Sequence, residues 1–309
     1  MQTPNIHHMH FFDSEVLKSV VNDSETRHLQ LTSGRFEGKI KRIILPDIVI
    51  DHGEYNLKLL AQGAFSPNTV TLMIIHHVDE IGKVCGIDFQ GGSLITFPIH
   101  ADAEFTIPKH ANWTAINVPE VHLAKYGLKI NTMKLFMLNE KKFSQFNKVY
   151  LKLENELSKG EQSQEVLQDM ILSHYIHTIE SLDNKLELYY SDGYLMALNI
   201  RDYLVEHIDE PLQMYKLCQL TNKSVRTIEI TFKQVFNLTV RDYHAHYRLS
   251  LIRQALMHDK NGSVSNAALK YGYLHFGRFS QKYKKLFGEL PSQTLRNTNV
   301  SMPIKQNFQ

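Results

Sequence analysis

The chain has 309 residues, 43% hydrophobic and 21% charged, which is the composition of a globular protein and a length typical of two domains. It contains no apolar run near the roughly eighteen residues of a membrane span, and residues 1–13 lack the basic and apolar regions of a signal peptide. Its two cysteines, Cys85 and Cys218, are too few for a disulfide framework. We therefore expect a cytoplasmic protein without a membrane segment.

The net charge of +2 hides an uneven distribution of charge. Residues 193–300 contain 15 Lys or Arg and 8 Asp or Glu, a balance of +7, whereas the rest of the chain has a balance of −5. A basic C-terminal part beside an acidic N-terminal part indicates that only the former meets a polyanion. Chance variation of surface charge is the alternative.

The chain is β-rich from residue 29 to about residue 117. Asp51-His52-Gly53 is expected to form a turn, and residues 88–93, with Gly91 and Gly92, contain the strongest hairpin signal. The strand-like segments are 40–50, 69–75, 84–89 and 93–97. Several short strands predict a small barrel or sandwich. Its core is expected to hold Phe89, Phe97, Phe105 and Trp113.

The pattern changes to helix after Pro119. Residues 143–157 and 167–182 carry apolar side chains at intervals of three and four residues, and residues 158–163 break the pattern between them. These two helices either pack on the β-rich part or pair with another subunit, and the sequence leaves both open. Residues 184–193 are expected to connect to the next domain.

Two segments near the C-terminus repeat each other, at residues 214–222 and 264–272. Each has an apolar residue, two others, an apolar residue, a small residue, three others and then a turn residue. The small residue allows two helices to cross closely, and the turn residue tolerates a left-handed backbone. These are the requirements of a helix-turn-helix unit. The small residues are Cys218 and Ala268, and the turn residues are Asn222 and Gly272.

A second helix follows each turn, with one apolar face and one face left for DNA. The apolar faces are Ile228, Phe232 and Phe236 in the first unit and Phe279, Tyr283 and Phe287 in the second. Arg can read guanine, Gln adenine and Glu cytosine, whereas Lys suits phosphate. The predicted DNA-binding residues are Ser224, Arg226, Thr227, Glu229, Ile230 and Lys233 in the first unit. In the second they are His275, Phe276, Gly277, Arg278, Gln281, Lys282, Lys284 and Lys285.

Residues 243–256 form an amphipathic pattern that joins the two units as a linker helix. A rigid tandem of this kind places its two recognition helices in successive major grooves. The sequence therefore predicts an α+β protein. A β-barrel domain with helices (1–190, β-rich to about 117 and helical over about 120–190) precedes an all-α DNA-binding domain (193–300) and a flexible tail (301–309).

Residues 194–296 resemble the AraC/XylS transcription regulators. The resemblance is carried by Val264-x-x-Ala-Ala268-x-x-x-Gly272-Tyr273, continuing to Phe287-Gly288-x-x-Pro291, and by the linker segment 248–256. It implies a cupin-like N-terminal domain for sensing and dimerisation. Asn222 stands where Gly is usual and Val240 where Pro is common. Ile230 and Phe276 are apolar at positions where polar base-reading residues are common, and they could contact thymine methyls.

The histidines raise the alternative of a cupin-type metalloenzyme with an accessory helical domain. His76 and His77 are adjacent, so in a strand they point to opposite faces and cannot chelate together. His8 and His10 share a face, but in a terminal segment that we expect to fray. We predict no metal, cofactor or catalytic residue.

The expected function is transcription regulation by a homodimer that binds double-stranded DNA and RNA polymerase. The resemblance implies that the protein activates transcription. A small-molecule effector in the N-terminal domain is implied by the resemblance. Lys39, Lys41 and Arg42 are candidates for holding an acidic effector, on residue type alone. A third possibility is a protein that binds DNA without sequence preference.

Overall fold

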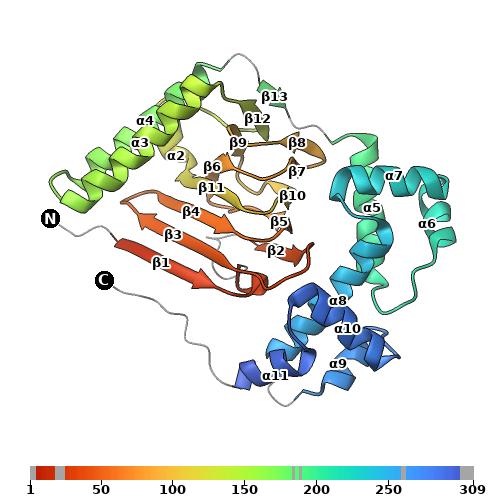
Figure 1. Cartoon of the computed structure of the whole chain (residues 1–309). Coiled ribbons are helices and arrows are strands. Elements are labelled where there is room, and N and C mark those ends of the chain that lie inside the picture. Colours follow the sequence, from red (N-terminus) through yellow and green to blue (C-terminus); the bar gives the residue numbers. More distant parts are fainter. Residues whose placement is uncertain (1–4, 18–24, 183–184, 188–189, 259–261, 300–309) are drawn as a thin grey trace.

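The protein is a mixed α+β chain in which an antiparallel sheet domain precedes a helical domain (Figure 1). A computed structural model describes residues 5–17, 25–182, 185–187, 190–258 and 262–299, so the expected tail at 301–309 lies outside it. The strands are β1 (Asn5–Phe11), β2 (Glu25–Gln30), β3 (Gly38–Ile44), β4 (Val49–Tyr55), β5 (Leu59–Ala64), β6 (Thr69–His77), β7 (Gly82–Val84), β8 (Ile87–Phe89), β9 (Ser93–Phe97), β10 (Asp102–Ile107), β11 (Ala111–Pro119), β12 (Lys134–Met137) and β13 (Lys185–Glu187). The helices are the 3-10 turn η1 (Ser14–Val16), α2 (Glu120–Ala124), α3 (Glu140–Lys159), α4 (Gln164–Glu180), α5 (Asp192–Glu206), α6 (Met214–Thr221), α7 (Val225–Phe236), α8 (Val240–His258), α9 (Val264–Lys270), α10 (Phe276–Phe287) and α11 (Pro291–Asn299).

The strands form two sheets. The larger has the order β1-β3-β4-β11-β6-β9-β12-β13, and the smaller the order β2-β5-β10-β7-β8. Among the described residues the two sheets do not join into a closed ring, so the expected barrel describes the fold only loosely. The four aromatic residues expected in its core are all buried, at 0–6% exposure.

The residues expected in strand 40–50 belong to two strands, β3 and β4, and the turn expected at residues 51–53 is wrong. The chain turns near Pro46 and Asp47, between β3 and β4, and Gly53 lies inside β4 opposite Trp113 of β11. A Cβ at Gly53 would overlap the indole ring of Trp113. This glycine therefore makes room for a buried ring rather than for a turn.

The hairpin expected at residues 88–93 is also wrong. β8 pairs with β7 in the smaller sheet, whereas β9 pairs with β6 and β12 in the larger one, so Gly91 and Gly92 connect two sheets. The hairpin joins β7 to β8 through Cys85 and Gly86, both with positive φ (49° and 79°). Two consecutive residues of this kind form the tight turn that suits the twist of paired strands.

The N-terminal segment does not fray over residues 5–11. All seven residues of β1 pair with β3, from Asn5 opposite Ile44 to Phe11 opposite Gly38. The ring of Phe11 occupies the space that a Cβ at Gly38 would take. His8 and His10 are thus held on an ordered strand.

Helices α3 and α4 cover one face of the larger sheet. Asn139 caps the start of α3, Gly160 ends it with φ 67°, and Ser163 caps α4. The side chains of Phe146, Leu153 and the α4 stripe form a buried cluster with β3, β4, β6, β9 and β11. Of the two possibilities left open by the sequence, packing on the sheet is therefore found.

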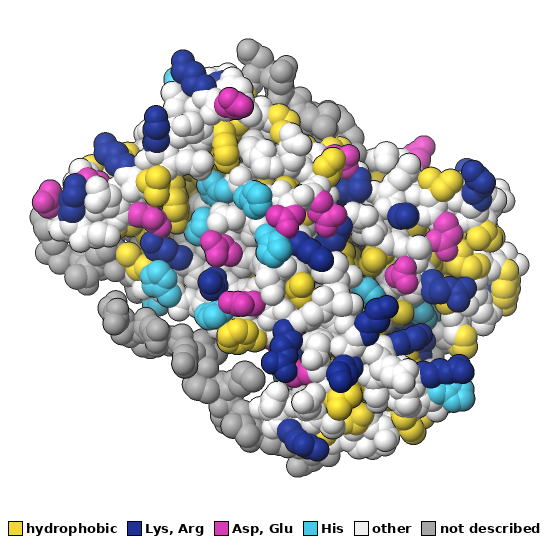
Figure 2. Space-filling view, in the orientation of Figure 1, with side chains coloured by type: hydrophobic (Ala, Val, Ile, Leu, Met, Phe, Trp, Pro, Cys, Tyr) yellow, Lys and Arg dark blue, Asp and Glu magenta, His cyan; other side chains and the backbone are white. Residues whose placement is uncertain are grey.

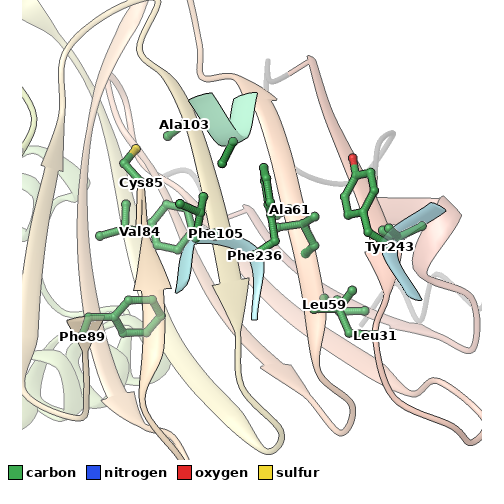
Figure 3. Packing of buried hydrophobic residues seen from close by; sticks show 14 of the residues in the cluster. Leu31, Leu59, Ala61, Val84, Cys85, Phe89, Ala103, Phe105, Phe236 and Tyr243 are labelled. Carbon is green, nitrogen blue, oxygen red and sulfur yellow. The ribbon is translucent and has the colours of Figure 1, made fainter. Parts of the chain in front are cut away.

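The smaller sheet is also covered by the helical domain. One apolar cluster runs from the residues between the sheets to α5, α7 and the start of α8. Figure 3 shows Phe236 and Tyr243 of the helical domain among Leu31, Leu59 and Ala61 of the sheet domain. Buried apolar area is the main source of stability in such a contact. The two domains therefore share one core.

Polar contacts join the sheet domain to both halves of the helical domain. Tyr194 Oη donates to Glu104 at 2.7 Å, and Arg201 forms an ion pair with the same carboxylate. Farther along the chain, the Gln30 side-chain amide donates to the Leu286 carbonyl at 2.7 Å. These bonds hold the first helical unit through α5 and the second through α10.

His28 on β2 predicts a pH dependence of stability. It is 5% exposed, and burial lowers its pKa to about 4. Below pH 6.5 the unfolded chain binds a proton at this residue that the folded chain does not, so stability falls as the pH drops. The difference between pKa 6.5 and about 4 corresponds to roughly 3 kcal/mol at pH 4.

We expect urea titrations between pH 7 and pH 4 to show a shallower pH dependence for His28→Leu than for the wild type. His258→Gln is the control, because His258 is exposed and its side chain forms no ion pair or hydrogen bond with any described residue. An unchanged slope in His28→Leu would show that His28 is protonated in the folded state. His76 and His244, whose pKa values burial also lowers to about 4, contribute to the slope that remains.

Candidate nucleic-acid interface

The first helix-turn-helix unit is formed by α6 and α7. Asn222 ends α6 in the left-handed region (φ 52°), as the sequence predicts. Ser224 then caps α7, its Oγ accepting from the Thr227 amide at 3.2 Å. Cys218, the expected small residue of the crossing, is partly buried and packs against the core.

The second unit is formed by α9 and α10. Gly272 has φ 75°, and Ala268 is fully buried, as expected at a close crossing. Gly288 ends α10 with φ 73°, and its amide donates to the Lys284 carbonyl. The two units are therefore built alike, and both left-handed turn residues are confirmed.

The predicted apolar faces of both recognition helices are buried. Ile228, Phe232 and Phe236 are 0% exposed, and Phe279, Tyr283 and Phe287 are at most 4% exposed. The opposite faces stay open to solvent. The exposed predicted DNA-binding residues are Ser224, Arg226, Thr227, Ile230, Lys233, His275, Phe276, Gly277, Arg278, Gln281, Lys282, Lys284 and Lys285.

Glu229 differs from the other predicted DNA-binding residues. It is half-buried, and its carboxylate accepts a long hydrogen bond (3.4 Å) from the Val240 amide. A proline at position 240 would lack that donor. Val240 and Glu229 therefore form a contact between α7 and α8. Through this bond, Glu229 helps to hold α7 against α8.

Arg248 of α8 ties the second unit to the linker helix and to the first unit. Its Nε donates to the Tyr271 carbonyl at 2.5 Å, and its guanidinium lies 4.6 Å from the ring centre of Tyr273. Arg248 also lies close to Gly272, which in turn faces the Asp209 carbonyl beyond α5. The turn of the second unit is thus packed against both α8 and the segment that joins α5 to α6.

Basic side chains are frequent over α8, α9 and α10. Figure 2 shows Lys and Arg gathered on that part of the surface, whereas Asp and Glu lie mainly elsewhere. Phosphate groups would be attracted to such a surface, and binding would weaken as salt is added.

Two exposed residues beside the turns were missed by the sequence interpretation. Leu274 precedes α10 and is 74% exposed, and Lys223 follows the left-handed Asn222. Both sit next to a predicted turn residue, which is the signal that could have identified them. They flank the recognition helices on the solvent side.

The basic residues suggested for an acidic effector are already paired. Arg42 donates to both oxygens of Asp51 at 2.7 Å, Lys41 donates to Glu154 at 2.6 Å, and Lys39 lies 3.9 Å from Glu37. Lys39 and Lys41 also line a pocket of about 330 Å³ beside β1, so their role as effector contacts stays a prediction.

The histidines of β6 have separate surroundings. His76 contacts Thr114 and Asn147, whereas His77 contacts Asp79. Within the described residues, no three His, Cys, Asp or Glu side chains are grouped so that they could hold a metal ion. No helix in the described part of the chain is both long and apolar enough to span a bilayer.

Comparison with known proteins identifies the helical domain. A family described as "Helix-turn-helix domain" matches residues 217–297. The XylDLEGF operon transcriptional activator 3 of Pseudomonas putida is 32% identical over 114 residues, which are 36% of this chain and 34% of the relative. Activator 2 of the same operon and organism is 33% identical over 95 residues, 30% of this chain and 60% of the relative.

One solved structure, of a probable AraC family transcriptional regulator from Rhodopseudomonas palustris CGA009, is 26% identical with a TM-score of 0.32. It covers 34% of this chain and 97% of its own. The matched region spans about a third of the first curated relative and 60% of the second. The match of residues 217–297 to the helix-turn-helix family favours DNA binding over a cupin-type metalloenzyme.

Proposed function

We propose that this chain, whose helical domain is of the AraC/XylS type, is a sequence-specific DNA-binding transcription regulator. The observation that supports this most is the pair of equivalent recognition helices, α7 and α10, each with a buried apolar face and an exposed polar face. Each helix would enter one of two successive major grooves. The linker helix α8 would hold them at a fixed separation.

The roles that we propose for the two domains are those expected from the sequence. Residues 193–300 would bind DNA, and residues 1–190 would sense a small molecule and mediate dimerisation. We further propose that the protein acts in the cytoplasm as a homodimer, without catalytic activity, and activates transcription through RNA polymerase. The two relatives above are named as activators, which supports that sign of regulation.

Effector control would act through the contact between domains. The sheet domain contacts α5 through Glu104, α7 through the hydrogen bond from Thr106 to the Phe236 carbonyl, and α10 through Gln30. A change in its packing would therefore move both recognition helices. A ligand shifts such an equilibrium only if it binds one arrangement more tightly. The proposed mechanism is therefore a population shift between arrangements that span DNA differently.

Selection of random DNA duplexes by the purified protein, followed by sequencing, tests the function. We expect enrichment of two short elements about one helical turn apart, roughly 10 base pairs from centre to centre. Salt-sensitive binding without any enriched sequence would contradict a specific reader.

Two substitutions on α10 are expected to separate base reading from phosphate binding. Arg278→Ala should cost about 1–3 kcal/mol at the selected site and relax one base position. Lys284→Ala should weaken binding to all sequences alike and reduce its salt dependence. Fluorescence anisotropy with the selected site and a scrambled duplex measures both effects.

Lys129→Ala is the matched control, because Lys129 is an exposed lysine on the sheet domain. It should bind both duplexes as the wild type does. Equal losses on both duplexes for Arg278→Ala would remove Arg278 from the base-reading residues.

A further inference from the structure

A cleft of about 280 Å³ lies where the smaller sheet meets α5 and α8. Its walls come from β2, β5 and β10 on one side and from the two helices on the other, and Glu15 of η1 also lines it. At about 30 Å³ for each water molecule in the liquid, it has room for a small molecule. A bound molecule would touch the sheet domain, the first helical unit and the linker helix together.

The face of the smaller sheet that borders the cleft can be identified from the strand register. Arg27 of β2 and Glu104 of β10 both pair with Gln62 of β5, so these three side chains share one face. The hydrogen bond from Tyr243 Oη to Gln62 shows that this face meets α8. Asp102 lies two residues from Glu104 in the same strand and therefore points the same way.

The cleft contains charges of both signs, and some of them are already paired. Arg201 of α5 forms ion pairs with Glu104 and, at 2.6 Å, with Asp202. Arg27 lies 5.2 Å from the ring centre of Tyr247, and within the described part of the chain it makes no ion pair. The carboxylate of Asp102 likewise forms no ion pair or hydrogen bond with any described residue. Both side chains are exposed.

A guanidinium group binds a carboxylate through two parallel hydrogen bonds, and a carboxylate binds an ammonium group. Arg27 and Asp102 lie two strand spacings and two residues apart, roughly 12 Å between α-carbons. Their side chains lie on the same face, and both residues line the cleft. The half-buried Val205 adds an apolar surface to the wall.

We propose that this cleft binds a small zwitterion of the amino-acid type, its carboxylate on Arg27 and its ammonium group on Asp102. The role of this ligand as the effector rests on the proposed function. The binding of the ligand does not rest on it and can be tested without DNA. By contacting α5 and α8 as well as the sheet, the ligand favours the arrangement in which the three are packed together.

The test uses the full-length protein and the common α-amino acids, added one at a time at millimolar concentration. Thermal denaturation identifies those that stabilise the protein, and calorimetry gives their affinity. We expect stabilisation by one amino acid or a few of similar side chain. The corresponding acid without the amine, and the corresponding amide without the carboxylate, should each bind at least about tenfold more weakly.

Arg27→Gln and Asp102→Asn should each weaken binding of the same amino acid by about tenfold or more. Because both side chains are exposed, the variants should unfold at the wild-type temperature without ligand. Arg241→Gln, an exposed arginine on α8 outside the cleft, is the control and should bind as the wild type does.

Two results would overturn the inference: no amino acid stabilises the wild type, or the deaminated acid binds as tightly as the amino acid. The DNA selection described above is a separate measurement. A protein that selects a DNA site but binds no amino acid loses only this inference. One that binds an amino acid but selects no DNA site loses only the proposed function.

Discussion

Replacing Arg253 by alanine is expected to destabilise the protein by about 3–5 kcal/mol. Arg253 lies on α8, its side chain is 11% exposed, and it forms ion pairs with Asp13 at 2.6 Å and with Glu289 at 2.9 Å. Burial lowers the pKa of Arg253, but Asp13, Tyr283 and Glu289 outweigh this effect and hold it above its ordinary value. Alanine would leave two carboxylates, each 12% exposed, without their cation.

The loss should be visible in urea unfolding at pH 7 and should differ among three variants. Arg253→Lys keeps the charge but not the fork of donors, so we expect an intermediate loss. Asp13→Asn combined with Arg253→Met should cost less than the two single losses together, because one of the two carboxylates is removed with the cation and only Glu289 is left unpaired. A loss of stability under about 1 kcal/mol for Arg253→Ala would mean that water reaches the ion pairs of Arg253 freely.

Replacing Gly272 by alanine is expected to cost about 2–5 kcal/mol and to abolish DNA binding through the second unit. A left-handed residue with a side chain costs about 1–2 kcal/mol, and added bulk in a packed site typically costs about 1–3 kcal/mol. Both apply, because Gly272 has φ 75° and its Cβ would overlap the Arg248 guanidinium and the Asp209 carbonyl. The backbone carbonyl cannot move aside as a side chain can.

Alanine substitutions at two other glycines separate the cost of the left-handed backbone from the cost of the added bulk. Gly127 also has positive φ (72°) but nothing within 4 Å of an added Cβ, so Gly127→Ala should show the backbone strain alone. Gly277 has open space and lies in α10, where alanine should stabilise the helix by about 0.5–1 kcal/mol. If Gly272→Ala costs no more than Gly127→Ala, the tight packing at the turn is not maintained in solution.

The helical domain could be predicted in detail because its signals are local. An apolar residue at every fourth position marks Ile228, Phe232 and Phe236, and all three are buried. Asn222 and Gly272 were identified by their place in a repeat and have the left-handed backbone expected. Helix α11 went unpredicted, since its polar segment contains no such pattern.

The sheet domain was harder because its turns are decided by distant residues. Gly53 is required by Trp113, which is sixty positions away in the chain, and not by its neighbours. Cys85 and Gly86 make the actual hairpin, although cysteine is rarely a turn residue. Strand β1 is held by its pairing with β3, and nothing within the segment itself predicts that partner.

The contacts between domains could not be predicted at all. Glu104 and Gln30 are polar residues within strands, and a sequence pattern assigns such residues to a solvent-exposed face. They are buried, at 5% and 2% exposure, because a second domain covers them. Their role depends on how two separately recognisable domains meet.

The smaller sheet is covered on both faces, and this limits where the protein can be cut. Val235 lies against Gly86, the Phe236 carbonyl accepts from Thr106, and Tyr243 donates to Gln62. A helical fragment excised near residue 190 would turn this apolar surface toward water and would tend to aggregate. For recombinant work, a soluble DNA-binding fragment therefore requires polar replacements at the severed surface.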